Sequence, residues 1–217
     1  MNKVFLLLCT LSVVLACIPP NGPELVTKGN KHLVCVTING SRRNVFNPVV
    51  DEFTRVNYTN SYTDKETLYV DDDHTYISVS TATSLKNVKS VSKLYLYGRK
   101  YYPILTAVIS VEKGEVVAIT WDDGCYSCQE GCEQNSMYLE DGEIQIIQAN
   151  DPKYSVWAGQ SCYLDQSCDA TKKNCDLKLY IVWSGTDKDG RPLSSSNMRF
   201  SRFDGATLSS IYNTIVN

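Results

Sequence analysis

The distribution of cysteines constrains the fold of this 217-residue chain more than any other feature. Six of the nine cysteines lie between Cys125 and Cys175, whereas the preceding stretch from Val36 to Gly124 contains none. Small secreted domains gain stability from disulfides, whereas cytosolic proteins keep their thiols reduced. The cysteines therefore favour an extracellular domain that is stapled by disulfides.

The first sixteen residues have the features of a secretory signal peptide. Met1-Asn2-Lys3 is a short cationic start, and the apolar run Val4–Ala16 follows it and ends in a small residue. The apolar run extends only to Ile18 before two prolines, which is too short to cross a hydrocarbon core of about 30 Å. We therefore expect residues 1–16 to be removed and the mature chain to have no membrane span.

Cysteine parity supports cleavage after Ala16. Removal of residues 1–16 discards Cys9 and leaves eight of the nine cysteines, an even number that can pair fully in an oxidising compartment. The alternative is a bacterial lipoprotein signal, in which Cys17 is acylated and an odd number of cysteines remains. Parity favours the first interpretation, with residues 17–217 as one secreted β-rich domain and residues 125–175 as its disulfide-rich half.

The close spacing of Cys125 and Cys128 allows three interpretations. A zinc site needs a second pair at similarly tight spacing, and the later cysteines are more widely separated. A redox pair normally opens a helix in a βαβ unit, whereas this pair follows a strand pattern. Structural disulfides are therefore preferred, and no metal site is expected. We expect Cys17 to pair with Cys35 and the other six to pair among themselves, namely Cys125, Cys128, Cys132, Cys162, Cys168 and Cys175.

Alternating apolar and polar residues predict strands along most of the chain. Residues 74–80 alternate cleanly, and residues 177–183 form a strongly apolar strand that we expect to be nearly central in a sheet. Asn39-Gly40 predicts a two-residue hairpin turn with positive φ at both positions, and Asp141-Gly142 predicts another hairpin turn of this kind. Short connections in residues 94–121 predict an antiparallel meander of three strands, of which the second is a long strand at residues 101–111.

The expected fold is mostly β. It is an antiparallel β-sandwich or open barrel, stapled by disulfides, with hairpins throughout. One short C-terminal helix is expected because apolar residues recur at helical spacing near the end of the chain, at Leu208, Ile211, Tyr212 and Ile215.

The net charge of the chain and its sequence motifs disfavour several classes of function. A formal net charge of −3 and a pI near 5.4 give no basic footprint for nucleic acid or for an anionic membrane. The chain has two histidines, no G-x-S-x-G motif and no H-E-x-x-H motif. Asp122 and Asp123 follow Trp121, on which a sugar could stack, so they could be the paired carboxylates of a glycoside hydrolase. Neighbouring residues of a strand point to opposite faces of the sheet, however, so these two carboxylates are poorly placed to act as an acid/base pair. We therefore expect no catalytic residues.

Several tyrosines and one tryptophan are candidates for a contact surface. Alternate residues of a strand share a face, so the tyrosines around residues 95–102 predict an aromatic strip that also contains an arginine. Such strips bind sugars by stacking or form protein contacts. The alternative is that the rings only cover a face of the sheet. The strip consists of Tyr95, Tyr97, Arg99, Tyr101 and Tyr102, with Trp121 nearby.

Two further features suggest surface positions. Asn39-Gly40-Ser41 and Asn57-Tyr58-Thr59 are glycosylation sequons, so Asn39 and Asn57 are candidate glycan sites. Asp71-Asp72-Asp73 could hold calcium through carboxylate oxygens, although it lacks the alternate ligand spacing of a calcium loop. A solvated turn is the preferred interpretation of these aspartates, and no other cofactor is expected.

Three segments of the second half carry a resemblance to a known group. They read A-I-T-W-D-D-G-C-x-x-C at Ala118–Cys128, C-D-L-K-L-Y-I-V-W-S-G-T-D at Cys175–Asp187, and S-S-S-N-M-R-F-S-R-F at Ser194–Phe203. This pattern resembles small secreted cysteine-containing proteins of ciliates whose function is not established. The resemblance implies a shared extracellular β domain and assigns no catalytic residue.

These observations favour a non-enzymatic extracellular protein. The first hypothesis is a structural or interaction protein of a cell surface, matrix or fibre, which binds protein partners or assembles with itself through exposed edge strands. The second is a lectin-like carbohydrate-binding module that stacks sugars on Trp121, on Trp157 or on the aromatic strip. A secreted hydrolase is the third.

Overall fold

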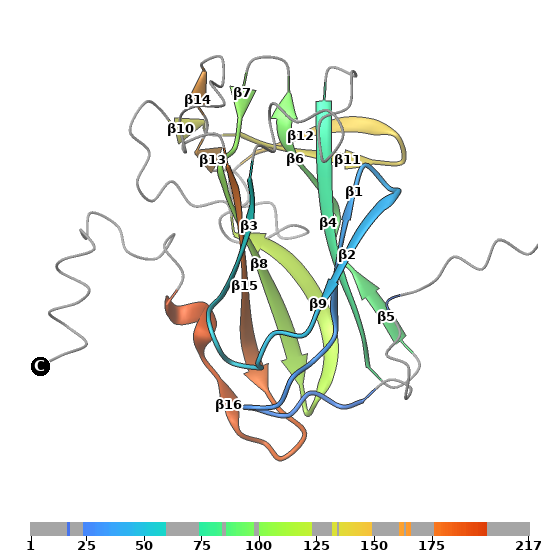
Figure 1. Ribbon diagram of the computed structural model, residues 1–217, viewed down its shortest axis with the longest axis vertical. Helices are drawn as coiled ribbons and strands as arrows, with labels where there is room; N and C mark the ends of the chain where they lie inside the picture. The colour runs from blue at the N-terminus through green and yellow to red at the C-terminus, as the bar shows by residue number, and fades with distance from the viewer. Residues whose placement is uncertain are drawn as a thin grey trace, which may run out of the picture.

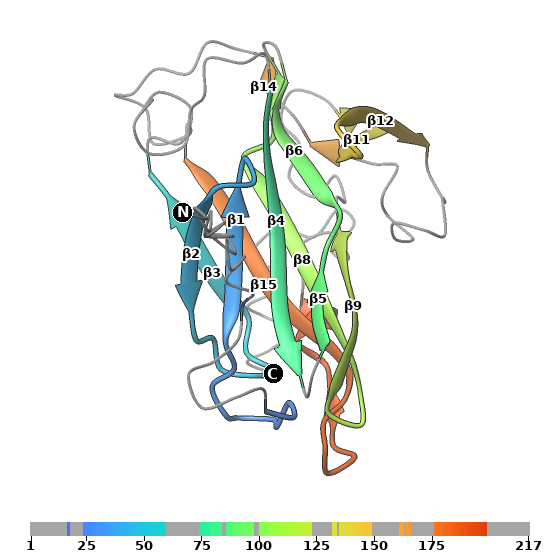
Figure 2. The same ribbon diagram turned by 90° about the vertical axis from the view of Figure 1, so that its right-hand side faces the viewer.

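The computed structural model describes Cys17 and residues 24–59, 74–83, 86–97, 100–122, 132–133, 135–148, 161–162, 164–165 and 176–198. In this part of the chain, two β-sheets pack face to face (Figures 1 and 2). The prediction of a mostly β, sandwich-like fold is therefore confirmed. The predicted signal peptide and C-terminal helix lie outside the described residues.

The first sheet has the strand order β12-β11-β6-β4-β1-β2, and every neighbouring pair on this path is antiparallel. The short strands β5, β7 and β14 lie off this path. The strands are β1 (Val34–Ile38), β2 (Arg42–Phe46), β4 (His74–Thr83), β5 (Lys86–Lys89), β6 (Ser92–Tyr97), β7 (Lys100–Tyr101), β11 (Asn135–Glu140), β12 (Glu143–Gln148) and β14 (Leu164–Asp165).

The second sheet has the order β16-β15-β8-β9, with β3 also paired to β15. A separate two-stranded ladder joins β10 to β13, and a short 3-10 helix, η2, follows β16. These elements are β3 (Thr54–Tyr58), β8 (Ile104–Glu112), β9 (Glu115–Asp122), β10 (Cys132–Glu133), β13 (Ser161–Cys162), β15 (Leu177–Thr186), β16 (Pro192–Leu193) and η2 (Ser195–Met198).

Both predicted hairpin turns are present. Asp141 and Gly142 have φ values of 51° and 83°, and Glu140 pairs directly with Glu143 across them. Asn39 and Gly40 also have positive φ, but Ile38 pairs with Arg42, so this loop contains three residues. The expectation of a two-residue loop at Asn39-Gly40 is therefore wrong, whereas the expected φ signs are confirmed.

The predicted meander across residues 94–121 is wrong because the chain changes sheets within it. β6 and β7 pair in the first sheet, whereas β8 and β9 pair in the second. Pro103 lies between β7 and β8 and cannot donate a ladder hydrogen bond. The long strand expected at residues 101–111 is consequently broken at this proline.

β15 is central in the second sheet, as the sequence predicts, but one of its neighbours is unexpected. It runs parallel to β8 over eight residue pairs from Lys178 with Ile104 to Gly185 with Val111. Parallel neighbours require a long crossover connection. The connection from β8 to β15 contains β9, which runs antiparallel to β8 and returns the chain to the end where β8 begins. β15 starts at that end and can therefore run parallel to β8.

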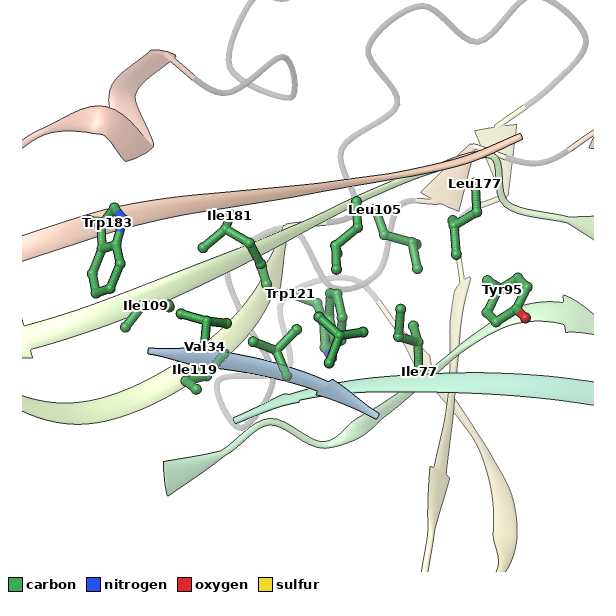
Figure 3. Packing of buried hydrophobic residues seen from close by; sticks show 14 of the residues in the cluster. Val34, Ile77, Tyr95, Leu105, Ile109, Ile119, Trp121, Leu177, Ile181 and Trp183 are labelled. Atoms are coloured by element: carbon green, nitrogen blue, oxygen red, sulfur yellow. The ribbon is translucent and has the colours of Figure 1, made fainter. Parts of the chain in front are cut away.

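One core fills the space between the sheets. Alternate residues of β15 point into it beside residues of β8 and β9 from the same sheet, and they face residues of β1 and β4 from the other sheet (Figure 3). Its largest fully buried side chains include Trp121 and Trp183. A core of this size supplies the main favourable term of folding.

The predicted disulfide between Cys17 and Cys35 is confirmed, with a Cα–Cα distance of 5.8 Å. Cys35 pairs with Ser80 across β1 and β4, so its side chain lies on the same sheet face as that serine. The side chains of Val34 and Val36 point the other way, into the core. The disulfide therefore fastens Cys17 to the outer face of the first sheet.

Candidate functional site

Two residues of the predicted aromatic strip, and the nearby Trp121, do not lie on the surface. Tyr95, Tyr102 and Trp121 are all buried, with Trp121 0% exposed. Trp121 lies between the sheets (Figure 3), and its Nε1 donates a hydrogen bond of 2.8 Å to the Val91 carbonyl. The prediction of a contact surface is wrong for these three residues, because the core uses their apolar area. Arg99 and the side chains of Tyr97 and Tyr101 lie outside the description.

A buried lysine lies beside Tyr102 and beside a further buried tyrosine, Tyr138. Lys93 in β6 is 0% exposed, and its Nζ lies 5.1 Å from the ring centroid of Tyr102 and 4.7 Å from that of Tyr138. Both distances are within the range of a cation–π interaction, which strengthens when the cation is removed from water. Lys93 stands opposite Ile77 on one side and opposite Tyr138 on the other. It therefore links the β11–β12 hairpin to the core.

The sequence gives little warning of this arrangement. Lys93 follows a serine at the start of a strand, a pattern typical of a solvent-facing lysine. Only its register opposite Ile77 places it on the core side, and register depends on the tertiary pairing. A fully buried amine is inaccessible to a large substrate, so Lys93 has a structural role in this fold.

At the opposite end of the molecule, a buried carboxylate organises the turns. Asp187 is 0% exposed and accepts hydrogen bonds from the backbone N–H groups of Lys28, Asp189 and Arg191. The Arg191 Nε also donates to it at 2.8 Å. Burial alone would raise the pKa of Asp187, but these hydrogen bonds outweigh burial and hold the pKa well below its usual range.

Asp51 extends the same arrangement. Its carboxylate accepts hydrogen bonds from the N–H groups of Ser194 and Ser195 at 2.6 and 2.7 Å, and Lys28 Nζ lies 2.6 Å from it. Burial opposes ionisation of Asp51, but the bonds from Lys28 and the two serines lower its pKa overall. We call Lys28, Asp51, Asp187 and Arg191 the base cluster, because they lie around β16 at one end of the sandwich. Its cations already compensate its carboxylates, so it ties loops together and is poorly suited to a metal ion.

Most of the positions considered for calcium or for sugar cleavage are not part of the described structure. Asp71, Asp72, Asp73 and Asp123 lie outside the described residues. Asp122 is buried and stands opposite Thr106 in the ladder between β8 and β9. Within the described ranges, no group of three or more histidine, cysteine, aspartate or glutamate residues could hold a metal ion.

The two sequons have different environments. Asn39 lies in the β1–β2 loop, where its Oδ1 accepts a hydrogen bond of 3.0 Å from the Tyr76 N–H and its Nδ2 is buried. Asn57 is exposed on β3, and its Nδ2 donates to Asp176 Oδ2 at 3.3 Å. The sequence motif is the same at both positions, but in the structure the Nδ2 atom of Asn39 is buried and Asn57 is exposed.

Four of the six cysteines in residues 125–175 lie outside the described residues. For the other two, Cys132 and Cys162, the structure describes the backbones, which stand directly opposite each other in the ladder between β10 and β13. Opposite positions of an antiparallel ladder bring two Cα atoms to about 4.5–5.5 Å, close to the usual Cα separation of a disulfide. The pairing of the six cysteines among themselves stays a prediction that agrees with this register.

One accessible feature of the described surface is an edge of the first sheet. β2 pairs with β1 on one side and with no other described strand, and its residues Arg42, Arg43, Asn44 and Val45 are exposed. Val45 is 58% exposed, more than the other large exposed hydrophobic residues of the described part. An unpaired edge presents backbone N–H and C=O groups to an incoming strand. β2 is therefore the candidate functional site.

A comparison with protein families matches residues 84–215 to the family described as Uncharacterised protein DDB_G0273449. The chain belongs to this family. The match covers β8, β9 and β15, together with Lys93 and Asp187, but it does not include β1 or β2. No curated protein and no solved structure matches the chain.

These comparisons add a family but no activity. The resemblance to secreted ciliate proteins is untested by them and stays a prediction. Among the described residues, no helix is long and apolar enough to cross a membrane.

Proposed function

We propose that this protein is a non-enzymatic extracellular structural or interaction protein, and that β2 is its docking edge. The observation that carries the proposal is the exposure of β2, which forms one of the two outer strands of the first sheet and presents Val45 and two arginines. Strand addition to such an edge gives affinity through backbone hydrogen bonds and specificity through alternate side chains.

The charge of β2 indicates what would bind there. Arg42 and Arg43 are exposed and β2 contains no acidic residue, although the chain as a whole carries a net charge of −3. Opposite charges placed across neighbouring strands stabilise a pair, and like charges destabilise it. We therefore propose an extended acidic segment of a partner protein as the occupant of this edge.

The extracellular location is part of the same proposal. The chain begins with a cationic and apolar segment typical of a secretory signal, and the Cys17–Cys35 disulfide agrees with an oxidising compartment. Carbohydrate binding is less well supported, since Trp121, Tyr95 and Tyr102 are buried and cannot stack on a sugar.

The proposal is tested by the distribution of variants between the medium and the insoluble extracellular fraction of the native cells. Val45→Asp places a negative charge on the docking edge. Its retained fraction is expected to fall about fivefold, because the lost cross-strand contact and the new repulsion together cost about 1 kcal/mol. Higher salt is expected to release the wild-type protein as well.

Val117→Asp is the matched control, because Val117 is 48% exposed on β9 of the other sheet. It is expected to be retained like the wild type. Equal release of both variants would refute β2 as the docking edge, and protein that never leaves the cell would refute the extracellular location. Retention that requires only copies of this chain would show that the acidic partner is wrong.

A further inference from the structure

Only one of the two sequons is compatible with a glycan in the folded protein. N-glycosylation forms a bond between the asparagine Nδ2 and the anomeric carbon of an oligosaccharide. The bond from that carbon to the pyrophosphate of the lipid-linked donor breaks, and one Nδ2 proton is lost. The folded protein must therefore leave Nδ2 room for a sugar and keep its other hydrogen bonds.

Asn39 does not meet this condition. Its Nδ2 is buried, and its Oδ1 is held by the Tyr76 N–H at 3.0 Å. The Asn39 N–H also donates to the Tyr76 carbonyl at 3.0 Å, so side chain and backbone are both fixed against β4. The next residue, Gly40, has φ +71°, and a Cβ there would lie 3.2 Å from the Tyr76 hydroxyl. A sugar on Nδ2 would require the β1–β2 loop to separate from β4.

Asn57 meets it. The residue is exposed on β3, and its Nδ2 makes a hydrogen bond of 3.3 Å with Asp176 Oδ2. An asparagine Nδ2 carries two hydrogens, and glycosylation replaces only one. The other can continue to donate to Asp176 while the sugar extends into solvent.

We propose that the folded, secreted protein carries an N-linked glycan at Asn57 and none at Asn39. The transferase acts on chains before they finish folding, so copies modified at Asn39 would fail to close the β1–β2 loop against β4 and would not be secreted. This inference rests on the extracellular location in the proposed function, and not on the choice of β2 as the docking edge.

The glycan would also affect which edge is open. β3 pairs with β15 and with no other described strand, so it is an edge of the second sheet. Natural proteins protect such edges by covering or charging them. A glycan at Asn57 would cover β3, so that β3 would not compete with β2 for an incoming strand.

The test is site-specific mass mapping of the full chain secreted from a eukaryotic host, before and after enzymatic removal of N-glycans. Removal converts a glycosylated asparagine to aspartate, which marks the position. Thr59→Ala removes the sequon of Asn57 and Ser41→Ala removes that of Asn39, and neither changes the asparagine itself. The wild type and Ser41→Ala are expected to carry one glycan, and Thr59→Ala none.

A glycan on Asn39 of the folded secreted protein would overturn the inference, as would unmodified Asn57 in secreted wild-type protein. Either result would leave the docking edge untouched, because the Val45→Asp experiment can be repeated on the unglycosylated Thr59→Ala protein. Failure of the chain to enter the medium would instead overturn the extracellular location and the glycan together.

Discussion

At the scale of single residues, His32 is a buried titratable group whose ordinary pKa of about 6.5 lies near physiological pH. Its ring is buried and lies edge-on to the indole of Trp183, with the ring centroids 5.9 Å apart. Burial lowers the pKa of His32 below 6.5, although Glu24 and a hydrogen bond with the Ala82 backbone act in the opposite direction. The folded protein therefore holds His32 neutral when the unfolded chain would protonate it.

Stability is expected to decrease as the pH falls below about 6.5, because the unfolded chain then binds a proton that the folded protein excludes. The slope approaches about 1.4 kcal/mol per pH unit until the lower folded-state pKa is reached. Urea unfolding at pH 7.5 and at pH 5.5 measures this change in the free energy of unfolding. His32→Gln is expected to flatten this dependence, whereas His74→Gln retains it. An unchanged slope in His32→Gln would contradict this role of His32.

The residue-level predictions from sequence were right where a pattern has one physical cause. The Cys17–Cys35 pair follows from parity and clustering, and the positive φ of Asp141 follows from its Asp-Gly turn. Tyr95 and Trp121 were misassigned because aromatic residues suit both a core and a contact surface. Burial of Lys93 depends on register, and no local pattern encodes it.

At the scale of elements, the contact between β15 and β8 contains a position where a side chain does not fit. Gly185 has φ +96°, and a Cβ there would lie 1.9 Å from the carbonyl oxygen of Val111. Gly185 also pairs with Leu193 of β16. It therefore lets three strands meet at one point, where backbone atoms approach too closely for any other residue.

Gly185→Ala is expected to destabilise the protein by about 2–4 kcal/mol, since the backbone of β8 or β15 must move and the alanine is strained at positive φ. Gly190→Ala is the control. Gly190 also has positive φ, +78°, but a Cβ there meets nothing within 4 Å. Its cost is expected to be about 1 kcal/mol. Equal unfolding free energies for the two variants would contradict the close approach at Gly185.

The sequence predicts the strands themselves better than it predicts which strands pair with one another. Alternation identifies β4, and the strong apolar character of β15 identifies a central strand. The change of sheet at Pro103 and the parallel pairing of β15 with β8 depend on long-range packing. Short loops favour hairpins locally, and they do not reveal which sheet receives the next strand.

At the scale of the whole molecule, the two ends of the sandwich are fastened in different ways. The base cluster joins the segment before β1 to the turns around β16 through Asp51 and Asp187. At the other end, Lys93 joins the β11–β12 hairpin to the core. These contacts leave the ladder side of β2 as an accessible edge among the described strands.

The central claim is that β2 is the edge through which the protein docks, and amide hydrogen exchange tests it most directly. Exchange is compared between protein retained in the extracellular fraction and protein free in the medium. The β2 amides are expected to exchange at least about tenfold more slowly in the retained protein, because a partner strand protects them, whereas β9 amides are unchanged. Equal β2 exchange in both states, or new protection at β9 instead, would contradict the claim.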